Sequence, residues 1–198
     1  MKLTIPIILL IGIAGWSLSH QKVSAAKYIK WVEDPENGFI QEQNAGSLIY
    51  RLKYQPATYK AILAIGKPTV RKNELRQSLE TLEGLQYFTL QIKHQLDAQV
   101  LELENKSGMD NLSYFSFQMQ ERLQLIENDN RLPCALFHLE PSFGISPYLT
   151  IVLAFEREQG SENATKVLVY DDQHFGFGEL SFQFSDKILA NLPTLKTY

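Results

Sequence analysis

The sequence is poor in cysteine. Cys134 is the only one among 198 residues, so an intramolecular disulfide is excluded and a hydrophobic core must stabilise the fold. Hydrophobic residues make up 44% of the chain and charged residues 21%, which is typical of a folded globular domain rather than a disordered one. Because Cys134 lies in the apolar stretch of residues 132–137, we expect a buried, unreactive thiol.

Positive charge is also scarce. The chain has 19 Lys and Arg against 22 Asp and Glu, a net charge of −3, and its basic residues form no stripe. Binding of nucleic acid is therefore not expected, since it depends on clustered Lys and Arg that neutralise phosphates. The sequence contains no Gly-x-Ser-x-Gly, His-Glu-x-x-His or nucleotide-binding fingerprint. No specific enzyme class and no cofactor are thus indicated.

What the sequence does have is an N-terminal apolar run over residues 3–16, preceded by Lys2. A run of about 14 residues suits a signal peptide better than a membrane-spanning helix, which needs about 20. Small side chains at Val23-Ser24-Ala25 predict cleavage between Ala25 and Ala26. We therefore expect a signal peptide over residues 1–25 and export to the periplasm or the medium.

An uncleaved inner-membrane anchor is the alternative interpretation of the same run. Lipid attachment is not expected, because Trp16 stands where a lipoprotein would have its cysteine. No later apolar run approaches membrane-spanning length, so no spanning helix is expected after signal cleavage.

Residues 26–198 are expected to form a single α+β domain. Apolar alternation with period two predicts strands, and apolar spacing of three and four residues predicts helices. The expected strands cover residues 47–55, 85–93, 95–104, 134–139, 148–156, 165–171 and 179–184; the expected helices cover 56–66, 70–83, 111–127 and 185–190; residues 28–32 form a short strand or helical turn. Short connections favour a mainly antiparallel sheet that ends in a four-strand meander, with the helices packed on it. The strand 148–156 is apolar on both faces, so it should be central and covered by the helix 111–127.

The first polar cluster with possible chemistry is Asp171-Asp172-Gln173-His174, followed by Phe175-Gly176-Phe177-Gly178. Two carboxylates and an imidazole within four residues could bind a cation. The same residue types are also those of a loop between two strands, in which Asp bonds the local backbone and Gly adopts positive φ. We favour the turn, expect no metal, and expect replacement of His174 by Ala to change stability by no more than about 0.5 kcal/mol.

The second polar cluster is His138 and Glu140, which lie two residues apart on a predicted strand and so point to the same side, with Cys134 four residues before His138. Together they resemble the set of catalytic side chains of a thiol hydrolase, a cysteine, a histidine and a carboxylate. Residues four apart on a strand are separated by about 13 Å, however, which is too far for a nucleophile to pass a proton to its base. We therefore favour a row of solvent-facing side chains.

Aromatic residues gather in the first half of the chain. If several of them shared an exposed face, they would suit a peptide or glycan partner, as rigid amphipathic rings do at interfaces. Packing in the core is the preferred interpretation. The residues concerned are Tyr28, Trp31, Tyr50, Tyr54, Tyr59 and Tyr87.

Four blocks, at residues 28–38, 52–59, 169–176 and 192–196, resemble a family of small uncharacterised bacterial exported proteins, many of which are lipoproteins. The resemblance implies a periplasmic or surface location and supplies no activity. Trp16 departs from the lipoprotein pattern. We therefore expect a non-enzymatic binding or assembly module of the cell envelope, whose partner is a protein, peptide or glycan. The alternative is a small envelope hydrolase that uses His138 or the loop from Asp171 to His174.

Overall fold

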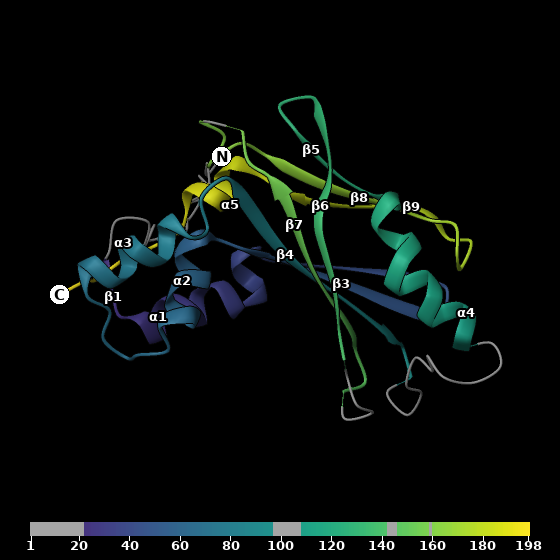
Figure 1. Ribbon diagram of the computed structural model, residues 1–198, viewed down its shortest axis with the longest axis horizontal. Coiled ribbons are helices and arrows are strands. Elements are labelled where there is room, and N and C mark those ends of the chain that lie inside the picture. Colours follow the sequence, from purple (N-terminus) through teal and green to yellow (C-terminus); the bar gives the residue numbers. More distant parts are fainter. Residues whose placement is uncertain (1–21, 97–107, 142–145, 159) are drawn as a thin grey trace, which may run out of the picture.

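The computed structural model describes residues 22–96, 108–141, 146–158 and 160–198. Eight strands form one antiparallel sheet in the order β2-β3-β4-β7-β6-β5-β8-β9 (Figure 1). Their bounds are β2 Ile40–Ala45, β3 Leu48–Gln55, β4 Leu85–His94, β5 Leu123–Glu127, β6 Asn130–Glu140, β7 Leu149–Glu156, β8 Lys166–Asp172 and β9 Gly178–Phe184. A separate parallel pair joins β1 (Lys22–Val23) to β10 (Thr194–Leu195).

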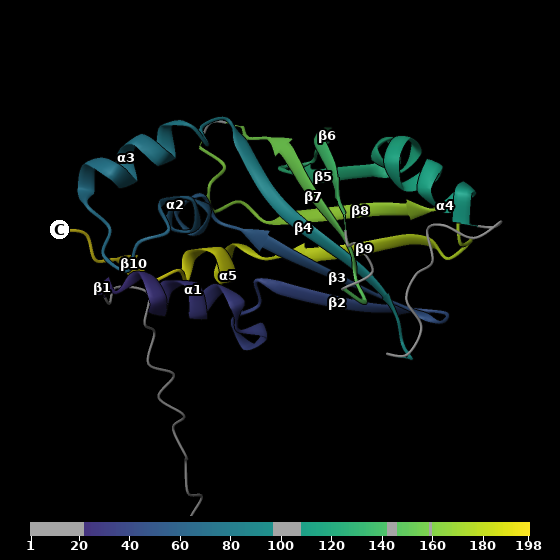
Figure 2. The same ribbon diagram turned by 60° about the horizontal axis from the view of Figure 1, so that its bottom comes forward.

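The helices are short. The α-helices are α1 Ala25–Glu33, α2 Ala57–Ile65, α3 Lys72–Glu80, α4 Gly108–Ser113 and α5 Asp186–Ala190; a π-helix, η2, covers Tyr114–Gln118, and the 3-10 helices η1 and η3 cover Pro35–Asn37 and Met119–Arg122. Figure 2 shows α1, α2, α3 and α5 gathered at one end of the sheet and α4 at the other. The mixture of helices and strands agrees with the expected α+β class.

The core lies between strands of the same sheet. Along β3, β4 and β7 every second side chain is buried, as period-two alternation requires. These side chains meet those of β8 and β9, which are not their neighbours in the sheet: the ring centroids of Tyr54 and Phe184 are 5.9 Å apart, and those of Tyr50 and Tyr170 are 6.1 Å apart. The sheet therefore curls until one face packs against itself.

The curled sheet is nearly a barrel. Its edge strands β2 and β9 approach each other, and the Gln43 side-chain amide on β2 donates a hydrogen bond to the backbone oxygen of Ser181 on β9. The Phe177 ring lies so closely against Gly46 in the β2–β3 turn that a Cβ there would overlap the ring. Gly46 also has a φ of +56°, so both space and backbone conformation require glycine at this contact.

This curling explains a difference from the predicted arrangement. We expected helices packed on the sheet, because a strand that is apolar on both sides must be covered on both. The sheet packs against its own inner face, the helices gather at its ends, and their buried residues, among them Tyr28, Tyr59, Phe115 and Met119, join the same core (Figure 2). The strand β7 is central, between β4 and β6, and Leu149, Ile151, Leu153 and Phe155 are all buried, as predicted.

The predicted four-strand meander is not continuous. β6 and β7 pair, and β8 and β9 pair, but β8 joins the sheet through β5 and not through β7. The reason is β5, which occupies residues that we predicted as the end of the helix 111–127. Asn128 and Asp129 both have positive φ, 48° and 65°, and form a two-residue hairpin turn in which Glu127 pairs with Asn130.

Several local expectations are confirmed. The strands predicted at 47–55 and 85–93 are β3 and β4, and the helix predicted at 56–66 is α2, closed by Gly66 in the left-handed conformation. The helix expected at 185–190 is α5, and the Ser185 hydroxyl caps its start by accepting a hydrogen bond from the Ile188 amide. The apolar run 3–16 lies outside the described residues, as does most of the strand expected at 95–104.

The residues around the predicted cleavage site take part in the fold. Ser24 is the N-cap of α1, with its hydroxyl 3.4 Å from the Lys27 amide; Ala25 is buried, while Ala26 is exposed. Val23 pairs with Leu195 across the two-stranded sheet. Over the part of the chain that the structure describes, we find no helix that combines the length and the apolar character needed to cross a membrane.

Candidate functional site

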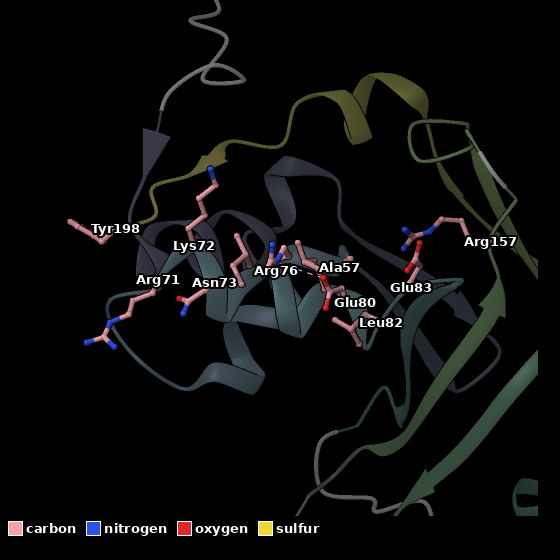
Figure 3. A pocket seen from close by; sticks show the side chains of 12 residues that line it. Ala57, Arg71, Lys72, Asn73, Arg76, Glu80, Leu82, Glu83, Arg157 and Tyr198 are labelled. Carbon is pink, nitrogen blue, oxygen red and sulfur yellow. Dashed lines mark ion pairs between the residues drawn. The ribbon is translucent and has the colours of Figure 1, made fainter.

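A long open cavity runs along α3. It has a volume of about 910 Å³ and lies between α3, the start of α2, the loop after β7 and Tyr198. Figure 3 shows Tyr198 and Arg157 at its two ends, with the side chains of α3 between them. We refer to this cavity as the α3 groove. Its lining residues are Ala57, Arg71, Lys72, Asn73, Leu75, Arg76, Leu79, Glu80, Leu82, Glu83, Arg157 and Tyr198.

An apolar row forms the centre of the α3 groove. Leu75, Leu79 and Leu82 follow one another at spacings of four and three residues, which places them on one side of the helix and the turn after it. None of the three is buried, and α3 has no buried residue at all. Leu75 packs against the edge of the core, and Leu79 and Leu82 are also partly covered, so the row keeps some of its apolar surface open to the groove.

Charged residues border this row. On the groove side of α3, Arg71, Lys72 and Arg76 lie toward the start of the helix, and Glu80 and Glu83 lie at its end and just after it. Arg76 and Glu80 form an exposed pair with a nitrogen–oxygen distance of 3.7 Å, drawn as a dashed line in Figure 3. Such an exposed pair contributes little to stability, so both side chains are available to another partner.

Two backbone connections hold the ends of the α3 groove. The Lys72 amide donates to the backbone oxygen of Tyr198 at 3.1 Å, and the Tyr198 amide donates to that of Val70 at 3.2 Å. At the other end, the Arg157 amide donates to Gly84 at 2.9 Å, and its guanidinium donates to the Leu85 oxygen at 2.8 Å. The groove walls are therefore fixed by hydrogen bonds on both sides of α3.

The predicted cluster at Asp171, Asp172 and His174 does not form one site. Asp172 is fully buried, and its carboxylate accepts hydrogen bonds from the Tyr50 hydroxyl at 2.5 Å, the Tyr170 hydroxyl at 3.3 Å and the Phe175 amide at 2.9 Å. Asp171 is half-buried and lies 3.7 Å from Arg122. Asp172 thus joins the turn after β8 to the core, as the turn interpretation implies, and it also binds two tyrosines that the sequence did not connect with it.

Burial is the main reason why the pKa values of Tyr50 and Tyr170 are raised well above that of a free tyrosine, and the Asp172 charge raises both further. The hydrogen bond from Tyr50 to Asp172 raises the pKa of Tyr50 further. The hydrogen bond between the Tyr170 and Tyr114 hydroxyls, 3.0 Å apart, raises the pKa of Tyr170 further. These phenols therefore stay protonated in the fold and serve as hydrogen-bond donors.

His174 is more constrained than a turn residue that is free in solvent. Its ring stacks on Tyr114 with centroids 4.1 Å apart and an interplanar angle of 9°, and its Nε2 lies 2.6 Å from the Asn111 side-chain oxygen. Aromatic contacts of this kind contribute about 0.5–1.5 kcal/mol. The expected cost of replacing His174 by Ala is therefore about 1 kcal/mol, larger than the sequence suggested.

The second predicted cluster, His138, Glu140 and Cys134, is divided between the two faces of β6. A bulge between Cys134 and Leu136 shifts the register, so that Cys134 lies opposite Phe155 while His138 lies opposite Val152. His138 and Glu140 are exposed, as expected, and Cys134 is buried on the other face. Burial raises the pKa of the Cys134 thiol to about 12, so the thiolate is not available near neutral pH.

A further buried polar cluster, which the sequence did not indicate, joins β4, β5 and β8. The Lys166 ammonium pairs with the Glu127 carboxylate, which also accepts from the Ser161 hydroxyl at 3.0 Å and the Gln86 amide at 3.2 Å. All four side chains are buried. Burial lowers the pKa of Lys166, and the hydrogen bond and charge of Glu127 oppose that shift.

Most of the aromatic residues in the first half of the chain are core residues. Tyr28, Tyr50, Tyr54 and Tyr59 are buried, whereas Trp31 and Tyr87 are half-buried. The preferred interpretation, core packing, is therefore confirmed for the four buried tyrosines. Within the described residues, no three His, Cys, Asp or Glu side chains come together in a way that could hold a metal ion.

The α3 groove was not predicted from the sequence. The sequence predicts a helix over residues 70–83, which contains α3, but its apolar spacing alone does not tell whether the leucines are buried or open. The position of Tyr198 and Arg157 beside this helix has no sequence signal. Comparison with known proteins assigns no relative to the chain, since no protein-family model, no curated protein and no solved structure matches it.

Proposed function

We propose that this protein is an exported, non-enzymatic binding module of the bacterial cell envelope, and that the α3 groove is its binding surface. The partner that suits the groove is an apolar peptide segment, such as one face of an amphipathic helix. The observation that carries the proposal is the row of Leu75, Leu79 and Leu82, partly buried, along a groove of about 910 Å³.

The shape and chemistry of the groove support a binding role. Helix-in-groove recognition uses apolar anchors at spacings of three and four residues, which is the spacing of these leucines. Covering apolar surface gains roughly 25 cal/mol per Å². Tyr198, with 67% of its surface exposed, adds an aromatic side chain of the type that is enriched at protein interfaces.

The envelope location rests on the sequence. Residues 3–16 with Lys2 before them are typical of an export signal, and the residues near Ala25 suit a signal peptidase. The four blocks that resemble exported bacterial proteins support the same location. Fractionation of cells that produce the chain, with detection in periplasm, inner membrane and medium, tests this part of the proposal. Recovery of the protein from the cytoplasm alone would contradict it.

The groove is tested with a fluorescent apolar anion, anilinonaphthalene sulfonate, titrated into the full chain. We expect saturable binding that is weakened at least about tenfold by Leu79→Glu, since a carboxylate in the centre of the row opposes both burial of the probe and its negative charge. Leu82→Glu is a second variant of the same row. Leu63→Glu is the matched control, because Leu63 is 50% exposed on α2 and does not line the groove.

Circular dichroism of each variant shows that the fold is retained. Equal probe binding by the wild-type chain, Leu79→Glu and Leu82→Glu, all folded, would refute the groove as the binding surface. Loss of binding in the Leu63→Glu control to the same degree would refute it as well, because the effect would then not be specific to the groove.

A further inference from the structure

The charges that α3 and its flanking residues bring to the groove are segregated by sign, while Arg157, from the loop after β7, adds a cation at the acidic end (Figure 3). The cations Arg71, Lys72 and Arg76 occupy the first part of α3 and the residue before it, and the anions Glu80 and Glu83 occupy its end. The leucine row runs between these two regions. A helix whose exposed apolar side is positive at one end and negative at the other is complementary to itself in the antiparallel orientation.

We propose that the partner of the α3 groove is a second copy of this chain, and that two α3 helices pair antiparallel about a two-fold axis near Leu79. This inference rests on the proposed binding function and names its partner. In a two-fold arrangement the same patch serves on both subunits, so a self-complementary surface is what it requires. A parallel pair would instead bring like charges together along its whole length.

The leucine spacing fits such a pair. Steps of four and three residues are those of a short coiled-coil seam. With the axis near Leu79, Leu75 of one copy faces Leu82 of the other, and the two Leu79 side chains meet in the centre. The same arrangement brings Arg76 near Glu80 of the other copy, twice in each dimer.

The dimer should be weak. A stable specific interface buries about 1,600 Å² in total, and two helices of two to three turns cover less. We therefore expect a dissociation constant of about 10–100 μM, and weaker association at high salt because the charged pairs are exposed.

Sedimentation equilibrium of the full chain at increasing concentration tests the proposal, with wild type and variants compared under identical conditions so that residues outside α3 contribute equally. Arg76→Glu places two carboxylates opposite each other, and Glu80→Arg places two guanidinium groups opposite each other. We expect each variant alone to dissociate at least about tenfold more readily than the wild type. An equimolar mixture of the two should associate again, because one copy then carries a carboxylate at both facing positions and the other carries a guanidinium group at both.

The mixture is the decisive sample. Each variant also breaks the exposed pair between residues 76 and 80 of its own helix, and mixing the two variants does not restore that pair. Association that returns in the mixture therefore reports contact between copies. Both side chains are mostly exposed, at 79% and 65%, and their replacement should leave the fold intact. Gln77→Glu and Gln77→Arg are the matched controls, since Gln77 is exposed on α3 outside the groove and should not affect association.

A wild-type chain that stays monomeric at about 500 μM, well above the expected dissociation constant, would overturn the self-pairing. So would a mixture that associates no better than its components. If either result came with probe binding that still depends on Leu79, the groove would remain a binding surface for another partner. If the self-pairing were overturned and probe binding did not depend on Leu79 either, the proposed function would fail together with this inference.

Discussion

Replacement of Lys166 by Met should destabilise the fold strongly, because it leaves the Glu127 carboxylate buried without its cation. Glu127 is 0% exposed and Lys166 1% exposed. After the replacement, Glu127 would keep only the Ser161 hydroxyl at 3.0 Å and the Gln86 amide at 3.2 Å. Removal of one member of a buried ion pair costs about 3–5 kcal/mol, which is a large share of the 5–15 kcal/mol that stabilises a typical domain.

The double replacement of Lys166 and Glu127 by Met should be far milder than either single one. Two unbranched apolar side chains of similar length fill the same space, and both ions and their desolvation cost disappear together. The neighbouring donors keep other acceptors: the Ser161 hydroxyl bonds the Glu158 oxygen at 2.8 Å, and the Gln86 amide bonds the Glu156 oxygen at 3.0 Å. We expect the double variant to lie within about 1 kcal/mol of the wild type, or above it.

Urea unfolding followed by far-UV circular dichroism measures the free energy of unfolding of the wild type, both single variants and the double variant. The double-mutant cycle then gives the coupling between the two side chains. A cost below about 1 kcal/mol for Lys166→Met would refute the reasoning, because it would mean that Glu127 is not held as a buried charge by Lys166. A double variant as unstable as the single ones would show that packing rather than charge decides this region.

Three further predictions concern the core, the pH dependence and the N-terminus. Phe155→Ala should lower the free energy of unfolding in urea by about 3–5 kcal/mol, because the Phe155 ring is fully buried; a loss below about 1 kcal/mol would contradict its place in the core. The pKa values of Tyr50 and Tyr170 are higher in the folded state than in the unfolded state. The stability that these tyrosines contribute is therefore complete below about pH 10, where unfolded tyrosine is still protonated, and it is lost as the pH rises further. Unfolding midpoints should therefore fall above about pH 10, less steeply in Tyr50→Phe; an equal slope in that variant would argue against the assignment. N-terminal sequencing of protein from the envelope should begin at Ala26, whereas a start at Met1 in the inner membrane would support the anchor. A domain that begins at Ala26 should be at least about 1 kcal/mol less stable than one that begins at Lys22, because it lacks the Ser24 cap, the buried Ala25 and the pairing of Val23 with Leu195.

The hydrolase alternative has its own test. A panel of activity-based probes for thiol and serine hydrolases should not label the purified chain, because the pKa of Cys134 is raised to about 12 and His138 lies on the other face of β6. Labelling that His138→Ala abolishes would show that this alternative is correct and that the binding proposal is incomplete.

The elements with clear periodicity, or with a turn-forming or helix-capping residue at one end, could be predicted from the sequence. Alternation over residues 47–55 and 85–93 identified β3 and β4, and Gly66 and Ser185 marked a helix end and a helix start. These features depend on neighbouring residues only, through side-chain periodicity and backbone conformation. Two strands of the eight-stranded sheet were missed: β2 (Ile40–Ala45), for which no strand was expected, and β5, whose Asn128-Asp129 pair we took as a helix end although its two positive φ values make a hairpin turn.

The candidate site required the tertiary structure. The sequence placed Asp171, Asp172 and His174 in a turn, but only the curled sheet brings Tyr50 to Asp172 from 122 residues away. The β6 bulge, which separates Cys134 from His138, depends on pairing with β7 and leaves no mark in the residues alone.

By itself, then, the sequence determined the side-chain periodicities, the central apolar strand β7, the absence of a disulfide and the leucine row of α3. The tertiary structure decided what covers each apolar face. Because the eight-stranded sheet curls onto its own inner face, the core takes residues from α1, α2 and α5 but no buried residue from α3, and Leu75, Leu79 and Leu82 stay partly open at one end of the sheet. Hydrophobic burial is proportional to area and has no direction, so a pattern of apolar residues cannot state which surface will cover it.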